Sequence, residues 1–291
     1  MGRPVRIFSR AAVAGEPDVV TMDVASVDVD LIAKALKGCD AVVHLAGANE
    51  VAMAADPDAS LAQTIAAARR VSLAAAQAGV GRFVYLSTIH VYGAALDRGG
   101  RVDERTIPEP RHPYAVARLA SEHLASAAGV DQLVVLRLTN SVGAPATERV
   151  ERWTLVANEL CRQAAAGDPL RLRSSGRQWR DFIDLGDVCR TIAASAIGSV
   201  PPGTYNLGSG QARTVLDLAG VIADVTGELI GTRPVVDAPP LVGEPPPRID
   251  VDVSRLLQHV DAPTTPIEAS VRELVEFCRA ASWAKPTNAD G

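Results

Sequence analysis

The feature that most constrains the fold of this chain is a repeated alternation of short apolar runs with longer alanine-rich stretches. Four short runs are mainly apolar, on both faces of an extended chain, and rich in β-branched residues, at 5–8, 41–45, 83–87 and 133–138. This composition is typical of parallel strands that are buried on both faces. Stretches of helical composition lie between them, at 31–37, 59–78 and 114–128, and a glycine follows each one directly. Glycine commonly follows the last residue of a helix. The alternation predicts an α/β fold with a doubly wound parallel sheet.

The rhythm changes after Asn140. Strand and helix signals become irregularly spaced, and six prolines fall between residues 234 and 247, which predicts a loop there. Two closing helices are expected near 254–258 and 267–280. The chain therefore divides into a regular N-terminal part and a smaller, less regular C-terminal part.

Composition and charge exclude several classes of protein. The formal net charge is 29 − 34 = −5 and no basic run stands out, which argues against a nucleic acid or an anionic membrane as partner. No apolar run approaches the length of a membrane span. The four cysteines are far apart and lack metal-ligand spacing, so we predict neither a disulfide framework nor a metal site. With no signal peptide visible, we predict a cytoplasmic protein with reduced thiols.

Polar and small residues gather where the predicted strands end, and ligands of doubly wound sheets bind at that edge. Tyr114 and Arg118 are four residues apart, so they share one face of a helix. A fixed cation near a phenol favours the phenolate, which suits Tyr114 to acid–base chemistry. The Thr88 hydroxyl is placed to hold the same substrate oxygen. Taken alone, such a Tyr–Arg pair is more typical of a solvated helix face, and we assign His44 and His90 structural roles.

Six motifs occur in a fixed order along the chain. They are similar to the patterns D-x-V-x-H-L-A-A at 40–47, S-S/T-x-x-V-Y-G at 87–93, P-Y-x-x-x-K-x-x-x-E at 113–122, R-x-x-N-x-x-G at 137–143, R-D-F-I-x-V-x-D-V at 180–188 and Y-N-L-G-S-G at 205–210. In this order they resemble the extended short-chain dehydrogenase/reductases. Within these, the pattern is similar to the NAD-dependent epimerase/dehydratases that act on nucleotide sugars, with UDP-glucose 4-epimerase as the nearest familiar pattern.

The resemblance implies a role for each matching residue. It implies a catalytic set of Tyr114 as acid–base, Thr88 and Arg118. It implies that substrate binds to Thr88, Asn140, Arg180 and Arg248, with Asn140 and Arg180 on the diphosphate. It implies that the cofactor, NAD or NADP, contacts Ser9, Arg10, Asp23, Val24, Leu45, Ala46, Gly47, Ser87, Tyr114 and Arg118.

The resemblance also implies a domain organisation and an assembly. Residues 1–139 would form a dinucleotide-binding domain, with return elements from about 181–208. Residues 140–291 would form mainly a substrate-binding cap. The expected assembly is a homodimer formed through the helices at 59–78 and 114–128.

The sequence departs from the family pattern at its start. The strand–turn–helix unit with a G-x-x-G-x-x-G turn is missing, and the strand at 5–8 looks like the family's second strand. Without the central first strand, the strands at 5–8 and 41–45 lose a shared partner. Either these two strands pair directly, or the natural protein starts upstream of Met1. We favour the second alternative.

Three further positions differ or leave a choice open. Arg118 stands where the family usually has lysine. The family's R-P-G-E/D reads 241–244 L-V-G-E here, so either Arg248 substitutes for the missing arginine or the substrate differs. Ser9 and Arg10 end the strand at 5–8, where NAD-preferring members usually have an acidic residue. They suit either the 2′-phosphate of NADP or stacking of Arg10 on adenine.

Three functions follow from these motifs and departures. The first is an NAD(P)-dependent UDP-hexose 4-epimerase that works by transient hydride transfer. The second is an NADP-dependent reductase of a nucleotide 4-keto-sugar. The third is a catalytically weakened protein that binds nucleotide sugars, which the missing glycine-rich turn and Arg118 would suit. No motif supports a flavin enzyme or a metalloenzyme.

Overall fold

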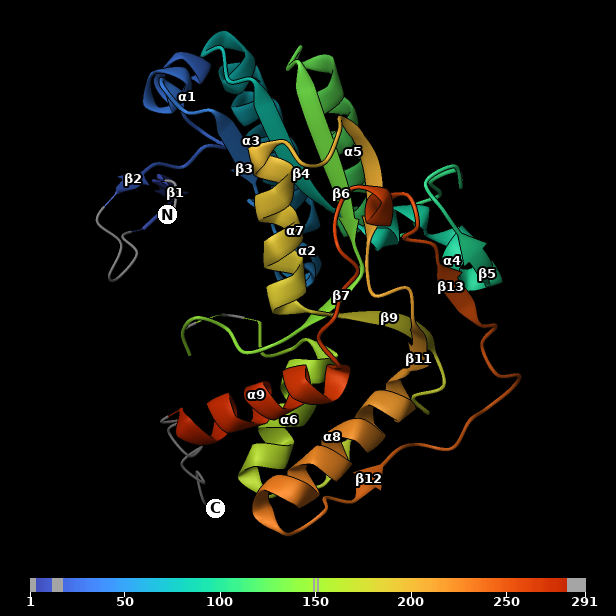
Figure 1. Ribbon diagram of the computed structural model, residues 1–291. Helices are drawn as coiled ribbons and strands as arrows, with labels where there is room; N and C mark the ends of the chain where they lie inside the picture. The colour runs from blue at the N-terminus through green and yellow to red at the C-terminus, as the bar shows by residue number, and fades with distance from the viewer. Residues whose placement is uncertain (1–3, 12–17, 149, 151, 282–291) are drawn as a thin grey trace.

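A computed structural model of the chain describes residues 4–11, 18–148, 150 and 152–281. Its main sheet has four parallel strands in the order β10-β6-β4-β3 (Figure 1). These strands are β3 (Ala41–His44), β4 (Arg82–Thr88), β6 (Gln132–Leu138) and β10 (Gly203–Leu207). Three of them coincide with predicted strands to within one residue at each end.

Helices cover both faces of this sheet, as the doubly wound fold requires. They are α1 (Val29–Leu36), α3 (Pro57–Gln77) and α5 (Pro113–Ala127) on one face and α7 (Leu185–Ile197) on the other (Figure 1). Alternate strand residues enter the two cores: Phe83 and Tyr85 pack on the α1–α3–α5 side, whereas Val84 and Val134 pack on the α7 side. Because both faces are buried, the middle of each strand is apolar, and most of the polar residues lie at the strand ends. The predicted α/β fold is confirmed.

The first two strands stand apart from the main sheet. β1 (Ile7–Ser9) pairs in parallel with β2 (Val19–Thr21), and β3 pairs with β4. In the described residues β1 and β3 do not pair with each other, so direct pairing of these two strands is wrong. Met1 lies outside the described residues, and a start upstream of it stays a prediction.

Short elements continue from the carboxyl ends of the main strands and surround the site. They are α2 (Glu50–Ala55), the 3-10 turn η1 (Ile89–Tyr92), α4 (Ala94–Arg98) and β5 (Gly100–Val102), which pairs in parallel with β13 (Ile249–Val251). Gly93, between η1 and α4, has φ 45° and lies against the backbone of Glu109, where a Cβ would stand 1.9 Å from the carbonyl oxygen. Only glycine fits this turn.

The C-terminal part has its own apolar core. Helices α6 (Val156–Ala166), α8 (Val215–Ile230) and α9 (Ile267–Ala280) pack around it. A three-stranded sheet of β7 (Asn140–Val142), β9 (Trp179–Asp184) and β11 (Ala212–Thr214) lies between this core and the main sheet (Figure 1). The remaining pair is β8 (Leu170–Arg171) with β12 (Val236–Asp237), and the latter interrupts the predicted proline-rich loop.

The two predicted closing helices have different outcomes. The helix expected at 267–280 is α9 with the same bounds. The helix expected at 254–258 is wrong, because only the three-residue 3-10 turn η2 (Leu256–Gln258) forms there. One turn does not repay the cost of nucleating an α-helix.

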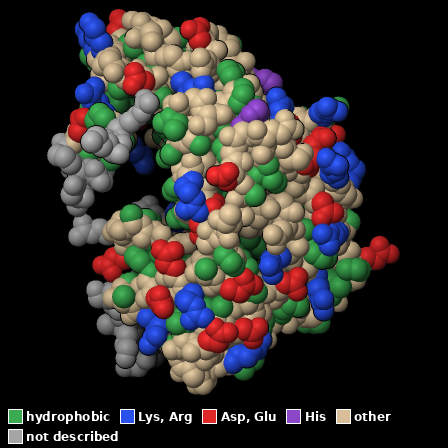
Figure 2. All heavy atoms as spheres, viewed as in Figure 1, with side chains coloured by type: hydrophobic (Ala, Val, Ile, Leu, Met, Phe, Trp, Pro, Cys, Tyr) green, Lys and Arg blue, Asp and Glu red, His purple; other side chains and the backbone are tan. Residues whose placement is uncertain are grey.

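The chain returns from the cap to the main sheet through α7 and β10, which lie inside the predicted return elements. The division into a dinucleotide-binding domain and a cap stays a prediction, and the separate cores are compatible with it. In the described part of the chain, no helix is both long enough and apolar enough to cross a membrane. On the face drawn in Figure 2, Lys and Arg side chains are interspersed with Asp and Glu side chains.

Candidate active site

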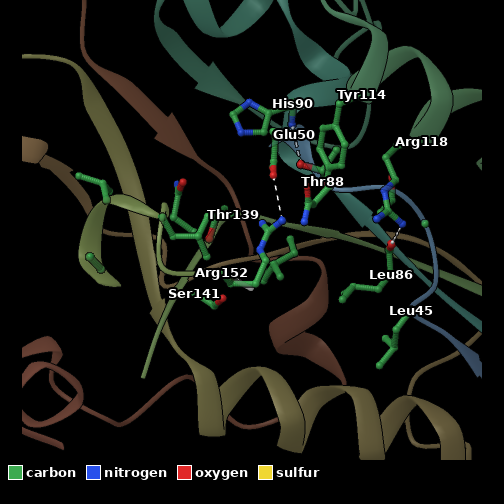
Figure 3. A pocket seen from close by; sticks show the side chains of 18 of the residues that line it. Leu45, Glu50, Leu86, Thr88, His90, Tyr114, Arg118, Thr139, Ser141 and Arg152 are labelled. Atoms are coloured by element: carbon green, nitrogen blue, oxygen red, sulfur yellow. Dashed lines mark hydrogen bonds and ion pairs between the residues drawn. The ribbon is translucent and has the colours of Figure 1, made fainter. Parts of the chain in front are cut away.

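A cavity of about 390 Å³ opens at the carboxyl ends of β3, β4 and β6. Its walls come from these strand ends, from the first turns of α2 and α5, and from the start of α6 (Figure 3). Seven residues predicted from the sequence line it: Leu45, Gly47, Ser87, Thr88, Tyr114, Arg118 and Asn140. The parallel sheet brings these residues together, because its strands all end at one edge.

Tyr114 is held in the first turn of α5. His112 caps this helix by accepting a hydrogen bond from the Ala115 N–H at 3.4 Å, and Pro113 begins it. The Tyr114 ring has the His112 imidazole stacked at 6.1 Å between centroids and the Arg118 guanidinium at 5.3 Å from its centroid. Arg118 is only 8% exposed. The Tyr–Arg pair is therefore not a solvated helix face, and it points into the cavity.

Arg118 joins the ends of two strands. Its Nη1 donates to the Ala46 carbonyl at 3.5 Å and to the Leu86 carbonyl at 3.4 Å. Behind it lie two rings of the core, His44 and Tyr85, stacked at 5.7 Å between centroids. Burial, with the nearby Arg118 cation, lowers the pKa of His44 to about 3, and burial raises the pKa of Tyr85. Both rings are neutral near pH 7, so Arg118 supplies the positive charge of this wall.

The ends of β4 and β6 are both tied to α5 through Glu122, by a hydrogen bond from β4 and a buried ion pair with β6. Ser87 donates to Glu122, and Glu122 accepts two hydrogen bonds from Arg137, at 3.1 and 2.7 Å. Both charged side chains are only 7% exposed. Thr88, the last residue of β4, caps η1 by accepting from the His90 N–H at 3.3 Å. These bonds fix Thr88 relative to Tyr114, which lies on the same helix as Glu122.

His90, for which we predict a structural role, lines the cavity. Its ring meets His112 edge-on, with centroids 5.5 Å apart. Burial, assisted by Arg180 and His112, lowers the pKa of His90 to about 4, so the ring is neutral near pH 7. The sequence signal for a place in the cavity was its position two residues after Thr88, at a strand end.

Two charged residues of the cavity were missed. Glu50, the first residue of α2, forms an ion pair with Arg152 at 3.1 Å (Figure 3). Arg152 lies just before α6, in the part of the chain where the spacing of sequence signals becomes irregular. No motif singled it out. Thr139, which also lines the cavity, donates to Asp181 at 2.9 Å, and Asn140 donates to the Asp181 carbonyl at 2.9 Å.

Seven predicted site residues do not line this cavity: Ser9, Arg10, Asp23, Val24, Ala46, Arg180 and Arg248. Ser9 and Arg10 end β1 and its adjoining bend. Asp23 accepts from the Ala25 N–H at 3.1 Å within a turn. Arg180 donates to the Trp179 carbonyl at 2.9 Å, and Arg248 lies over the Trp179 ring and pairs with Asp250 at 2.9 Å. Their roles toward ligands stay predictions.

The residues at the strand ends fit the nicotinamide half of a dinucleotide. Gly47 lines the cavity at the β3 end with the Arg118 guanidinium packed against it, and Thr88 and Tyr114 line the same cavity. For the pyrophosphate half, the usual binding element is a G-x-x-G-x-x-G turn that presents backbone N–H groups at a helix N-terminus. The given sequence contains no such turn, so none of the described residues form this element.

Sheet order, strand-end cavity and the Tyr114–Arg118 pair together define a protein of the short-chain dehydrogenase/reductase type. A sequence profile of the NAD dependent epimerase/dehydratase family matches residues 4–208. The chain belongs to this family. The predicted family is thereby confirmed, and so is the predicted cofactor class, NAD or NADP, at the level of the family.

Several known proteins are similar to this chain. A dTDP-glucose 4,6-dehydratase of Streptomyces niveus is 32% identical over 205 residues, 69% of this chain and 59% of that protein. A GDP-6-deoxy-D-mannose reductase of Pseudomonas aeruginosa is 31% identical over 196 residues, 64% of this chain and 63% of that protein. Both alignments thus span about three-fifths of the relative. The structure of MoeE5 in complex with UDP-glucose and NAD superposes with a TM-score of 0.79 at 26% identity, covering 96% of this chain and 91% of MoeE5.

Proposed function

We propose that this chain is an enzyme that inverts C4 of a UDP-hexose by transient hydride transfer, with Tyr114 as the acid–base group. The observation that carries the proposal is the placement of Tyr114, with Arg118 over its ring, beside Thr88 in one cavity at the strand ends. The likeness to MoeE5, which is described with UDP-glucose and with UDP-glucuronic acid, supports a UDP-sugar.

NAD(P), when bound, supplies the hydride acceptor and donor of this chemistry. As the phenolate, the Tyr114 oxygen takes the proton of the C4 hydroxyl, and the resulting Tyr114 hydroxyl returns this proton to the C4 oxygen after the sugar ring has turned over. Thr88 holds that hydroxyl by a hydrogen bond. Arg118 keeps a positive charge beside the Tyr114 ring and holds the β3 and β4 ends together through Ala46 and Leu86. Leu45 and Leu86 give the cavity an apolar part of its wall.

The titratable groups favour epimerisation over dehydration. Eliminating water from a sugar needs a base for a carbon-bound proton and an acid for the leaving hydroxyl, besides the group that serves C4. Among the described residues lining the cavity, Glu50 is the one carboxylate, and it is ion-paired. His90 is neutral, and its lowered pKa makes it a weak base. Epimerisation needs only Tyr114.

Two other functions each have an observation in their favour. Reduction of a nucleotide 4-keto-sugar by NADPH would use the same Tyr114, and the similarity to the Pseudomonas aeruginosa reductase supports it. A protein that binds nucleotide sugars without turnover would suit the lack of a glycine-rich turn in the sequence. The homodimer and the cytoplasmic location also stay predictions.

The test is interconversion of UDP-glucose and UDP-galactose by the full chain with NAD+, compared with Tyr114→Phe. Phenylalanine keeps the ring and removes the proton, so we expect turnover to fall by about 10²–10⁴-fold. Tyr205→Phe is the matched control, because its hydroxyl bonds the Pro201 carbonyl outside the cavity. Equal turnover of wild type and Tyr114→Phe would overturn the role of Tyr114. Binding of both sugars without turnover would favour the binding protein.

A further inference from the structure

Three charged side chains line the described cavity, and the proposed chemistry uses only one of them. Arg118 stands beside the Tyr114 ring and donates to main-chain carbonyls. Arg152 and Glu50 form an ion pair in the same cavity. In Figure 3 the Arg152 side chain extends from its loop toward Glu50, into the space that Thr88 and Tyr114 also line. Neither charge is needed for proton transfer at Tyr114.

The main chain is fixed at both residues of this ion pair, whereas their side chains are partly exposed. The Arg152 carbonyl accepts from the Asn158 side chain at 3.1 Å and from the Leu155 N–H at 3.3 Å, which fixes its main chain at the start of α6. Glu50 is fixed as the first residue of α2. The side chains themselves are 37% and 44% exposed. Ion pairs this exposed are weak, so Glu50 can release Arg152 to another anion and turn to water at small cost.

The cavity determines which part of a ligand Arg152 would meet. Its volume of about 390 Å³ holds a sugar ring but not a whole sugar nucleotide together with a dinucleotide. Tyr114 and Thr88 take the reacting hydroxyl, so the ring itself occupies this space. A negatively charged group on the ring is a carboxylate, and a carboxylate matches the planar fork of a guanidinium with two parallel hydrogen bonds.

We propose that Arg152 recognises a carboxylate on the sugar ring, so that the preferred substrates are UDP-hexuronates, and that Glu50 holds Arg152 until this carboxylate replaces it. The inference rests on the proposed function, because it assumes that Tyr114 and Thr88 bind a UDP-sugar. Arg152 is then a specificity-determining residue. His90 carries no charge near pH 7 and does not compete for the carboxylate.

The test is calorimetric titration of the full chain, with excess NAD+, by UDP-glucuronate and by UDP-glucose. We expect wild type to bind UDP-glucuronate at least about tenfold more tightly. Arg152→Gln removes this preference while changing the affinity for UDP-glucose by less than about threefold. Arg152→Lys, which keeps the charge but not the fork, gives an intermediate preference.

Removing the competitor has the opposite effect. Glu50→Gln leaves Arg152 unpaired, so we expect the affinity for UDP-glucuronate to rise a few-fold and that for UDP-glucose to stay constant. Arg173→Gln is the matched control, because Arg173 forms an exposed ion pair with Glu159 at 3.0 Å outside the cavity. It should change neither affinity.

The outcomes separate this inference from the proposed function. If wild type binds UDP-glucose and UDP-glucuronate equally, the inference is overturned and the proposed function stands. Equal losses for both sugars in Arg152→Gln also overturn it, because Arg152 would then contact a part that the two ligands share. If neither UDP-sugar binds, the proposed function and the substrate class are overturned together.

Discussion

The guanidinium of Arg118 lies flat against the α-carbon of Gly47, so that a Cβ atom on residue 47 would stand 3.1 Å from Nη2 and 3.2 Å from Cζ. Arg118 replaces the usual lysine of its motif, and Gly47 replaces the last alanine of D-x-V-x-H-L-A-A. The two departures from the family pattern therefore meet in space. Gly47 also has φ 149°, which side chains rarely adopt.

We expect Gly47→Ala to destabilise the protein, for two separable reasons. The backbone conformation costs on the order of 1–3 kcal/mol for a residue with a Cβ, whatever surrounds it. The contact with Arg118 adds to this cost. In an Arg118→Lys background the contact is relieved, so the same substitution should cost about 0.5–1 kcal/mol less. Urea unfolding of the four proteins measures this coupling energy.

Gly220→Ala is the control for this cycle. Gly220 lies inside α8, and no atom outside its own helix lies within 4 Å of a Cβ there. Alanine should stabilise the helix there by up to about 1 kcal/mol. If the changes in the free energy of unfolding caused by Gly47→Ala and Arg118→Lys are strictly additive, the two residues are not coupled and the prediction is wrong.

Breaking the buried ion pair behind Ser87 should cost far more than breaking an exposed one. Glu122→Gln removes the charge that Arg137 needs and leaves a buried guanidinium uncompensated. We expect a loss of about 3–5 kcal/mol in the free energy of unfolding. Glu159→Gln, which breaks the exposed pair with Arg173, should cost at most about 1 kcal/mol. Urea unfolding compares them, and similar losses for both variants would refute this ranking.

His44 should make stability depend on acidity. Burial lowers its pKa in the folded protein to about 3, below the usual histidine value of 6.5. Between these two values His44 is protonated in the unfolded chain but not in the folded protein. The free energy of unfolding therefore falls as the pH drops from about 6.5 toward 3. The slope reaches about 1.4 kcal/mol per pH unit.

The variant His44→Phe keeps a ring next to Tyr85 and removes this titration. Between about pH 7 and about pH 5.5, it should lose about 1 kcal/mol less than wild type in urea unfolding. His123→Gln is the control, because His123 is exposed on α5. An identical pH dependence in wild type and His44→Phe would show that the pKa of His44 is the same in the folded and the unfolded protein, which would contradict the prediction.

Sequence reasoning was strongest where local chemistry decides the structure. The apolar runs became the strands of the main sheet because residues such as Val84 and Tyr85 are buried on opposite faces. The strand-end motifs identified Thr88 and Tyr114 as neighbours, because parallel strands bring their ends to one edge. The helix predicted at 267–280 is α9, with the same bounds.

It was weakest where long-range contacts decide. Arg152 enters the cavity only because the fold brings the segment before α6 to Glu50 at the start of α2, and no local sequence pattern indicates that contact. Arg180 belongs to one of the six motifs, and Arg248 was proposed to replace a missing arginine. In the structure Arg180 donates to the Trp179 carbonyl, and Arg248 contacts the Trp179 ring and Asp250 instead of lining the cavity. α6 and α8 were missed for a related reason: their burial comes from packing against each other and α9.

The last prediction concerns the dinucleotide itself. A seat for the pyrophosphate needs main-chain N–H groups at a helix N-terminus, usually after a glycine-rich turn, and the sequence contains no G-x-x-G-x-x-G. In the structure Ser9 and Arg10 end β1, which pairs with β2 rather than with the main sheet. The wall for the nicotinamide half is formed by Gly47, Tyr114 and Arg118.

We therefore expect the 291-residue chain to bind NAD+ no more than about tenfold more tightly than nicotinamide mononucleotide. Calorimetry with both ligands measures the difference, and Arg10→Gln should leave both affinities unchanged. Micromolar binding of NAD+ with weak binding of the mononucleotide would contradict the prediction, because another segment would then have to supply the N–H groups.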